Sequence, residues 1–483
     1  MNIGANMPDK LKYFFSAGIS VIIAIFIFSA SYKYLVYIND YIKSLVIRTF
    51  NLYGSLDKNI SIISSNYKVY KKTFSDVPDE IFHFANILFY KGNKNIELNE
   101  LASSLIELTD HYRLSSLRNS LLSKNKINKN IINAGELILI EKPLPPFIID
   151  NNKNRAKSIV FTKGLYFTGD RAGHSAFLSK LPELRALGIN AIVFDIKDIT
   201  GIVHNRSKVK EVVEYNFSQK GGIDNLSKLI RECRANGMYT IARIAVFHDH
   251  LLWASDPSSR IKSKSTGKEW NPKSHELWCD PTNKKVQDYN IALAVEIAEA
   301  GVDEIQFDYI RFPTTGDKRD ADFAYSYGKM ERYEVIANFL QKAREQISKT
   351  GAFVSIDIFG VVAWGKYADI NSTGQRIELL AKHCDVISPM LYPSHFNDGF
   401  DGFKKPGDHP YHFIFVGCKK VKELAGDKVI IRPWLQAFRW NISVYNTAYI
   451  NEQIRASNDS GAYGYLFWNA SNRYGEVLGS NLR

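Results

Sequence analysis

The stretch GVDEIQFDYIRFP, residues 301–313, has the pattern of a buried β-strand that ends in a carboxylate, an aromatic ring, an arginine and a proline. Alternation along a strand places Gln306 and Asp308 on the same face of the sheet. A carboxylate that faces the inside of a sheet is unfavourable unless it is paired or used. A second run, FVSIDIFG at residues 353–360, repeats the pattern with Asp357. The sequence therefore predicts two carboxylates at the ends of two successive strands.

Strand-like and helix-like segments alternate on both sides of this stretch. Such alternation predicts a (β/α)₈ TIM barrel, in which active sites lie at the C-terminal ends of the strands. The alternative is a doubly wound open sheet, but no glycine-rich phosphate loop follows the first strand. The expected strands are 164–168, 191–196, 240–247, 304–310, 353–358, 385–390, 429–436 and 463–468. The amphipathic helices expected between them include 177–187, 226–236, 286–300, 333–350, 377–383 and 448–459.

The composition is that of a globular protein with a basic surface. The chain has 483 residues, 45% of them hydrophobic, and a formal net charge of +12. The basic residues are dispersed and form no recognisable binding motif, so we expect no nucleic-acid partner. The four cysteines, Cys233, Cys279, Cys384 and Cys418, lie far apart without a CxxC pair. This spacing argues against a disulfide framework and against a zinc site.

A long uncharged segment lies near the N-terminus, between Lys12 and Lys33. Its apolar centre, residues 19–28, and its length are typical of a helix that spans a bilayer. The preceding lysines and the following tyrosines favour a cytoplasmic N-terminus and an interfacial aromatic belt. The alternative is a cleaved signal peptide with a weak cleavage site at residues 29–31. We expect residues 1–37 to be a single-pass membrane anchor, with the barrel outside the cytoplasm, in the periplasm or the extracellular space.

Four further segments follow the anchor. Residues 38–84 are expected to form a linker or helical segment, 85–142 a small βααβ module, 143–160 a proline-rich linker, and 161–483 the barrel. The run 116–140 resembles the second half of a LysM domain, a family that binds polymers containing N-acetylglucosamine, such as peptidoglycan. The usual Gly-Asp-Thr-Leu at the start of that domain is replaced by NIEL at residues 95–98. The alternative is a plain βααβ spacer, since this pattern alone fixes no ligand.

Strand alternation aims a mixture of carboxylates, basic groups and aromatic rings at one mouth of the predicted barrel. Sugar sites need this mixture: carboxylates for the chemistry, arginine to hold a carboxylate ionised, and aromatic faces to stack on pyranose rings. The inward-facing residues expected in this way are Asp195, Lys197, Arg243, Gln306, Asp308, Asp357, Ser388, Met390, Tyr392, Arg432, Trp434, Gln436 and Trp468.

Five short motifs strengthen this interpretation because of their order and spacing. They are KGLY at 163–166, VFDIKD at 193–198, FDYIRFP at 307–313, SIDIFG at 355–360 and SPMLYP at 388–393. In these motifs the region from Lys163 to Gly475 resembles a glycoside hydrolase family of bacterial TIM barrels that is distantly similar to the α-amylase group. The resemblance implies a (β/α)₈ barrel that cleaves O-glycosyl bonds.

The same resemblance implies roles for the two strand-end carboxylates. In amylase-like barrels the carboxylate after the fourth strand is the nucleophile and one on the fifth is the acid/base. Asp308 would then be the nucleophile and Asp357 the acid/base. The alternative for each is a buried aspartate paired with Arg243 or Arg311. The fourth-strand run also resembles that of chitinase-type barrels, but Ile310 stands in place of their acidic glutamate, which argues against substrate-assisted cleavage of N-acetyl sugars.

Further residues at the predicted mouth are candidates for binding the substrate. Asp195 and Asp198 could contact it or form ion pairs with Lys197 or Arg243. The insertion at residues 248–283 is expected to be a lid, in which the tryptophans either stack on sugars or pack the loop. His248 and His250 could share a metal ion, but no third ligand is evident, so we expect no metal and no cofactor. The substrate-binding candidates are Asp195, Asp198, Arg243, His248, Arg311, Tyr392, Trp434 and Trp468.

The sequence thus predicts a membrane-anchored, exported glycoside hydrolase that acts on a cell-envelope or secreted polysaccharide. Two carboxylates on adjacent strands favour a retaining mechanism. One alternative is a non-catalytic glycan- or peptidoglycan-binding envelope protein. A second alternative, a metal-dependent deacetylase or hydrolase, depends on His248 and His250 alone.

Overall fold

The computed structural model describes residues 81–84, 87–141, 143, 155–270, 276–323 and 330–482. The chain divides into two units, Met1–Lys68 and Val69–Arg483, and every described residue belongs to the second. The expected membrane anchor and most of the segment after it lie outside the described residues. Among the residues that are described, no helix has the length and apolar character needed to cross a membrane.

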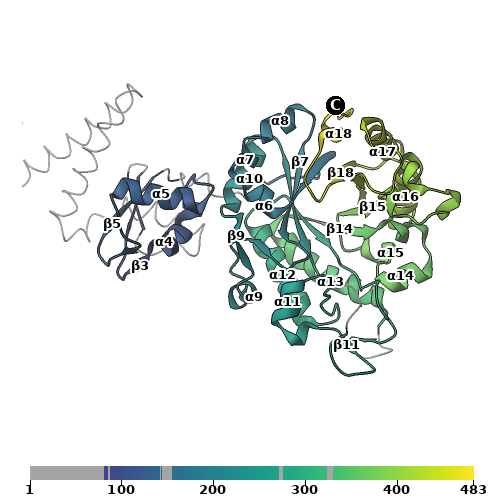
Figure 1. Cartoon of the computed structure of the whole chain (residues 1–483), viewed down its shortest axis with the longest axis horizontal. Coiled ribbons are helices and arrows are strands. Elements are labelled where there is room, and N and C mark those ends of the chain that lie inside the picture. The colour runs from purple at the N-terminus through teal and green to yellow at the C-terminus, as the bar shows by residue number, and fades with distance from the viewer. Residues whose placement is uncertain are drawn as a thin grey trace, which may run out of the picture. The chain divides into compact units, whose positions relative to one another are not determined.

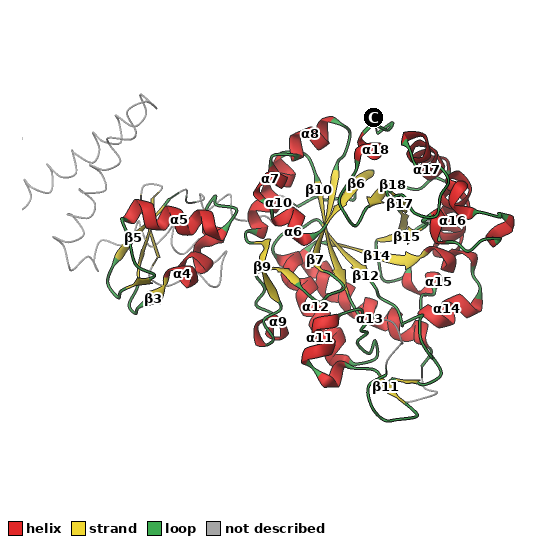
Figure 2. Ribbon diagram, viewed as in Figure 1, coloured by secondary structure: helices red, strands yellow, loops and turns green. Residues whose placement is uncertain are grey.

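Eight parallel strands form a closed barrel (Figures 1 and 2). Each strand hydrogen-bonds to the next in the chain order of the barrel, and β18 pairs with β6 to close it. The barrel strands are β6 (Thr162–Phe167), β7 (Ala191–Lys197), β10 (Tyr239–Ala245), β12 (Glu304–Asp308), β14 (Phe353–Phe359), β15 (Val386–Met390), β17 (Trp434–Gln436) and β18 (Gly464–Trp468). The prediction of a (β/α)₈ barrel is therefore confirmed.

Helices surround the barrel (Figure 2), and their positions follow from sequence periodicity and capping. In α12 (Lys284–Glu299), for example, Val286, Tyr289, Leu293 and Ile297 are buried at helical spacing, and the Asn283 side chain accepts a hydrogen bond from the first turn. The other helices are α6 (Gly169–Gly173), α7 (Ser175–Leu178), α8 (Leu181–Ala186), α9 (Lys210–Glu214), α10 (Leu226–Ala235), α11 (His250–Ser255), α13 (Arg332–Ile347), α14 (Tyr367–Thr373), α15 (Ile377–Leu380), α16 (Pro410–Ala425), α17 (Thr447–Asp459) and α18 (Gly475–Leu478). Short strands outside the barrel ring are β8 (Val203–Asn205), β9 (Ser218–Ile223), β11 (Lys262–Ser263) and β13 (Ala321–Asp322), whereas β16 (Ile430–Ile431) pairs with β15 ahead of β17.

Proline accounts for two differences from the expected elements. The helix expected at 177–187 is divided into α7 and α8, and Pro182 lies in the first turn of α8, where its missing N–H is tolerated. The strand expected at 429–436 is divided into β16 and β17 by Pro433, which cannot donate to the ladder. The helix α16 was not predicted, although Pro410 in its first turn is a typical start signal.

The interior of the barrel has an apolar layer and a buried ion pair. Tyr166, Tyr239, Trp434 and other residues pack together inside the ring of strands. Glu304, at the start of β12, pairs with Arg432, and both side chains are fully buried. Arg432 Nη1 donates to Glu304 Oε2 at 3.1 Å, and the Tyr239 hydroxyl donates to the same oxygen at 3.1 Å. This pair fills the N-terminal half of the barrel, at the opposite ends of the strands from Asp308.

The expectation that Lys197 faces the interior is wrong. Its ammonium pairs with Asp249 at 2.6 Å and lies 4.8 Å from the ring centre of Tyr289, which belongs to the surrounding helix α12. The pairing of β7 with β10 shifts register between Arg243 and Ile244, so one extra residue of β7 precedes Lys197. A bulge of this kind reverses the face on which the following side chains lie.

The module before the barrel has the strand–helix–helix–strand order predicted for it. Its central elements are β2 (Ile87–Lys91), α4 (Leu98–Leu105), α5 (Leu114–Asn125) and β5 (Leu137–Ile140), and β2 pairs antiparallel with β5. The strand β1 (Ile81–Phe84) precedes the expected start of the module and adds a third strand beside β2. Two short strands, β3 (Ile96–Glu97) and β4 (Ile131–Ile132), pair with each other. The resemblance to LysM domains stays a prediction.

Hydrogen bonds join this module to the barrel. The buried Asn225, which caps α10, donates from Nδ2 to the carbonyl oxygens of Ile106 and His111, at 2.8 Å in each case. Arg113 Nη1 donates to the carbonyl oxygens of Gly173 at 2.8 Å and Gly222 at 2.7 Å. Because buried polar groups of both segments satisfy each other, a fragment that lacks the module would leave them unpaired.

Candidate active site

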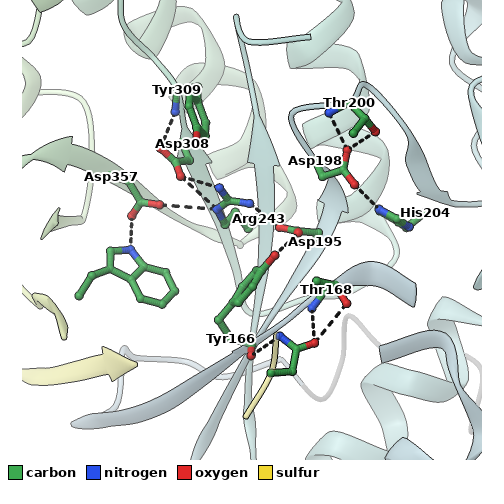
Figure 3. A network of polar contacts seen from close by, with 12 residues as sticks. Tyr166, Thr168, Asp195, Asp198, Thr200, His204, Arg243, Asp308, Tyr309 and Asp357 are labelled. Atoms are coloured by element: carbon green, nitrogen blue, oxygen red, sulfur yellow. Dashed lines mark hydrogen bonds and ion pairs between the residues drawn. The ribbon is translucent and has the colours of Figure 1, made fainter. Parts of the chain in front are cut away.

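The two predicted carboxylates lie side by side at the C-terminal ends of neighbouring strands (Figure 3). Asp308 ends β12 and Asp357 lies in β14, and the register pairs Phe307 with Ile356, one residue before each. The Asp308 side chain is 8% exposed, whereas that of Asp357 is fully buried. The structure therefore brings together the residues that the sequence singled out, at the face where TIM barrels hold their active sites.

Arg243, from β10, lies among three carboxylates. Its Nη2 is 2.6 Å from Asp308 Oδ2, its Nη1 is 2.5 Å from Asp195 Oδ1, and its Nε is 4.0 Å from Asp357 Oδ2. Burial alone would lower the pKa of Arg243, but Asp195 and Asp308 outweigh it and raise the pKa well above its ordinary value. The guanidinium of Arg243 is thus shared by three carboxyl groups.

Asp195, from β7, lies almost fully buried on the far side of Arg243. The Tyr166 hydroxyl donates to Asp195 Oδ2 at 2.5 Å, and Arg243 occupies the other oxygen. Burial raises the pKa of Asp195, and the charge of Arg243 opposes that rise. With both oxygens engaged inside the protein, Asp195 is placed to orient Arg243. Tyr166 was not among the predicted site residues, although it ends the KGLY motif.

Asp357 is held differently from Asp308. Trp434 Nε1 donates to Asp357 Oδ1 at 2.7 Å, while Oδ2 has no hydrogen-bond partner in the part of the chain that the structure describes. Burial, and then the charge of Asp308, raise the pKa of Asp357 well above its usual range. A buried carboxyl group with a raised pKa is suited to act as a general acid. Trp434 is itself buried, so it holds Asp357 and does not present a ring face to the mouth.

Tyr309 directly follows Asp308 and has a left-handed backbone, with φ of 54°. Its N–H donates to Asp308 Oδ1 at 2.6 Å. Its ring centre lies 5.1 Å from that of His248 and 5.9 Å from that of Trp278. This conformation ends β12 at Asp308, two residues earlier than predicted. Such backbone strain costs about 1–3 kcal/mol and is concentrated at functional sites.

Around Tyr309, His248 and Arg311 are packed against aromatic rings. The His248 ring stacks on Trp278 at 4.7 Å, and its Nε2 lies 3.1 Å from His250 Nε2. Burial, and then His250, lower the pKa of His248 to about 4. The Arg311 guanidinium lies 4.4 Å from the Trp278 ring centre, and burial lowers its pKa to about 10. No group of three potential metal ligands occurs among the described residues.

Two tryptophans of the insertion at 248–283 pack the loop. Trp270 is 3% exposed and Trp278 is 2% exposed, and the faces of Trp278 are covered by His248 and Arg311. The expectation that they serve as sugar platforms is therefore wrong for these two rings, and the packing alternative holds. His275, in the same insertion, lies outside the described residues.

Asp198 lies beyond the end of β7, where it is half buried. Its Oδ2 is 3.0 Å from His204 Nε2, and its Oδ1 accepts a hydrogen bond of 2.8 Å from the Thr200 N–H. Burial opposes ionisation, but the hydrogen bonds from His204 and Thr200 and the charge of His204 together outweigh it and lower the pKa of Asp198. His204 was not predicted, because it comes from β8, a strand outside the alternating pattern.

Tyr392 and Trp468 complete the set of predicted residues. Their ring centres are 5.9 Å apart, and Trp468 is also 6.3 Å from Tyr166. Tyr392 is buried and Trp468 is half buried, so Trp468 has part of its surface available. The structure thus gathers the strand-end aromatics on the side of the mouth formed by β15, β17 and β18.

Residues 164–474, more than half of the chain, match a family described as "Putative glycosyl hydrolase domain". The chain belongs to this family. Its barrel is accordingly a glycoside hydrolase domain, as the sequence predicted. No curated protein matches the sequence.

Several solved structures are similar to this glycoside hydrolase. One is a hypothetical protein from Ruminiclostridium thermocellum, with 35% identity over 40% of this chain and 96% of that chain, and a TM-score of 0.36. Another is the PgaB (BpsB) glycoside hydrolase domain from Bordetella bronchiseptica, with 13% identity over 65% of this chain and 95% of that chain, and a TM-score of 0.45. A third is the spore cortex-lytic enzyme SleL from Bacillus megaterium, with 10% identity over 81% of this chain and 84% of that chain, and a TM-score of 0.38.

Replacing Arg243 by glutamine should destabilise this glycoside hydrolase in a pH-dependent way. Without the guanidinium, the buried carboxylates bind protons more tightly in the folded state than in the unfolded state, so stability falls as pH rises. We expect a loss of about 3–5 kcal/mol at pH 7.5 and a smaller loss at pH 4.5. The measurement is urea unfolding at both pH values. Arg344→Gln, which breaks a partly exposed pair with Asp385, is the control and should lose less than about 1 kcal/mol. Equal losses at both pH values for Arg243→Gln would show that Arg243 does not neutralise the cluster.

Proposed function

We propose that this protein is a membrane-anchored, exported glycoside hydrolase that cleaves a cell-envelope or secreted polysaccharide by a two-carboxylate retaining mechanism. The observation that carries this proposal is that Asp308 and Asp357 lie side by side at the C-terminal ends of adjacent strands. Arg243 donates to one oxygen of Asp308 and the Tyr309 N–H donates to the other, so both oxygens are oriented by donors. Burial favours the protonated form of Asp357. The two groups therefore suit the roles of nucleophile and acid.

The steps follow from this division. Asp308 attacks the anomeric carbon while the bond to the leaving oxygen breaks and Asp357 gives that oxygen its proton. In the second step Asp357, now a carboxylate, takes a proton from water, and the water oxygen displaces Asp308 from the sugar. Because Asp357 is fully buried, the transfer requires the surrounding side chains to move as the sugar enters.

The spacing of the pair supports retention of configuration. Arg243 Nε lies 3.2 Å from Asp308 Oδ2 and 4.0 Å from Asp357 Oδ2, so both carboxyl groups lie near the same guanidinium nitrogen. Retaining enzymes hold their carboxyl groups about 5 Å apart, whereas inverting enzymes leave more than about 6.5 Å for a water. We assign the retaining outcome because both carboxyl groups lie against the same guanidinium, on neighbouring strands.

Other residues would bind or support the substrate. Trp468, which is half buried, would stack on a pyranose ring, and the buried Tyr392 would support it. Asp198, His248 and Arg311 lie after other strands, where sugar hydroxyls would bind. We assign Asp195 and Trp434 to support, because their polar atoms are engaged with Arg243 and Asp357.

Asp308→Asn should lower the hydrolysis of polysaccharide by about 10³-fold or more, because the amide cannot form the glycosyl ester. The assay is release of reducing ends from a panel of bacterial envelope polysaccharides that includes peptidoglycan, with circular dichroism to verify folding. Asp288→Asn, an exposed aspartate on α12, is the matched control and should keep full activity. Retained activity in Asp308→Asn would refute its role, and binding without hydrolysis by the wild type would favour the non-catalytic alternative.

Asp357→Asn should lower polysaccharide hydrolysis by about 10²–10⁴-fold, with a much smaller effect on nitrophenyl glycosides, whose leaving group needs no proton. In the wild type, activity should fall as pH rises through the raised pKa of Asp357, and this alkaline limb should be absent from the variant. Trp434→Phe removes a hydrogen bond that lowers the pKa of Asp357, so it should move the limb to higher pH. Equal losses on both substrates would contradict the role of Asp357 as the acid.

The proposed location rests on the uncharged segment between Lys12 and Lys33 and on the LysM-like module, which would bring the barrel to peptidoglycan. The full chain should remain with membranes after a carbonate wash, and protease added to spheroplasts should digest the barrel. Removal of residues 1–37 should release it. Recovery of the uncleaved full chain in the soluble fraction would contradict the anchor.

A further inference from the structure

An exposed tryptophan follows β17 at the same end of the barrel as Asp308. Trp440 is 56% exposed and lies four residues after the end of this strand. A single exposed apolar side chain needs no explanation by itself. Two further features suggest a role for Trp440. A series of ring contacts leads from it toward the carboxylates, and the loop that carries it is held by buried side chains.

The ring contacts run from Trp440 to the interior of the barrel. Trp440 lies 4.9 Å from His395, His395 lies 5.8 Å from Phe438, and Phe438 lies 5.4 Å from Trp468. Trp468 is in turn 6.3 Å from Tyr166, which donates to Asp195 in the carboxylate cluster. We call Trp468, Phe438, His395 and Trp440 the aromatic strip. It runs from the aromatic rings beside the carboxylate cluster to the exposed surface.

The loop that carries Trp440 is held by the buried side chain of Gln436. Gln436 Nε2 donates to the carbonyl oxygens of Phe438 at 3.0 Å and Trp440 at 3.5 Å, and its Oε1 accepts from the Ser394 N–H at 3.2 Å. Asn441, directly after Trp440, has φ of 46° and donates from Nδ2 to the Ser394 carbonyl oxygen at 3.4 Å. A loop whose backbone is fixed before binding loses little conformational entropy on contact with a ligand.

From these features we infer that the aromatic strip is a further sugar-binding subsite, in which Trp440 stacks on a pyranose ring of the polysaccharide, beyond the ring held at Trp468. The inference rests on the proposed function and deepens it, because a second platform outside the catalytic pair selects a polymer over a short saccharide. The flat faces of aromatic rings suit the apolar C–H faces of pyranoses, and the polar groups at the mouth suit their hydroxyls.

The test compares long and short substrates. Trp440→Ala should raise KM for the polysaccharide about tenfold, which corresponds to about 1.4 kcal/mol, and leave kcat and the hydrolysis of its disaccharide glycoside within about twofold. Trp440→Phe should recover most of the loss. The matched control is Tyr463→Ala, because Tyr463 is 43% exposed but precedes β18, at the opposite end of the barrel.

Binding in the Asp308→Asn background separates this inference from the proposed function. The probes are glycan strands of peptidoglycan and soluble starch, each with its disaccharide, in affinity electrophoresis and titration calorimetry. Adding Trp440→Ala to Asp308→Asn should weaken polymer binding about tenfold and leave disaccharide binding unchanged. The subsite would be overturned if the added Trp440→Ala left polymer binding unchanged, or if it weakened polymer and disaccharide binding equally. It would also be overturned if neither the wild type nor Asp308→Asn bound a polymer. If Asp308→Asn retained hydrolysis while Trp440→Ala still weakened polymer binding, the catalytic assignment would fail and the subsite would stand.

Discussion

The site depends on one buried cation. Arg243 is the positive group that contacts Asp195, Asp308 and Asp357, and these groups come from four different barrel strands. Charges taken out of water must be paired, or they neutralise by changing protonation state. One guanidinium cannot pair fully with three carboxyl groups, and burial and then the charge of Asp308 raise the pKa of the most deeply buried of them, Asp357. The excess of carboxyl groups over the one guanidinium thus sets the environment of Asp357 apart from that of Asp308.

The two ends of the barrel hold different kinds of residues. A buried ion pair lies at the N-terminal ends of the strands, and the proposed catalytic carboxyl groups lie at the C-terminal ends. At the N-terminal ends of the strands, Glu304 and Arg432 form a fully buried ion pair that also engages Tyr239. At the C-terminal ends, the Asp357 Oδ2 atom lacks a hydrogen-bond partner among the described residues, and Tyr309 has a strained backbone. Buried ion pairs rigidify a core, whereas backbone strain is concentrated where a ligand is to bind. The two halves are built from the same strands, so the rigid half holds the other in place.

Sequence reasoning predicted what depends on periodicity and failed where local geometry intervenes. Alternation placed Asp308 and Asp357 on the inner face, and the order of strands and helices predicted the barrel. The same alternation failed at Lys197, because a register shift in β7 is invisible in the pattern of apolar residues. It also gave no means of telling Trp434, which donates to Asp357 inside the barrel, from Trp440, which is exposed on a loop. Exposure is set by tertiary packing, which a single sequence does not encode locally.

Tyr309 has a consequence for any attempt to make this protein more thermostable. Its φ of 54° is one that glycine or asparagine adopts with less strain, so a design procedure that maximises stability would replace the tyrosine. The replacement would remove the ring that packs beside His248 and Trp278. It would also loosen the backbone N–H that donates to Asp308. A substitution that relieves the backbone strain at Tyr309 would therefore raise thermal stability and lower the proposed activity.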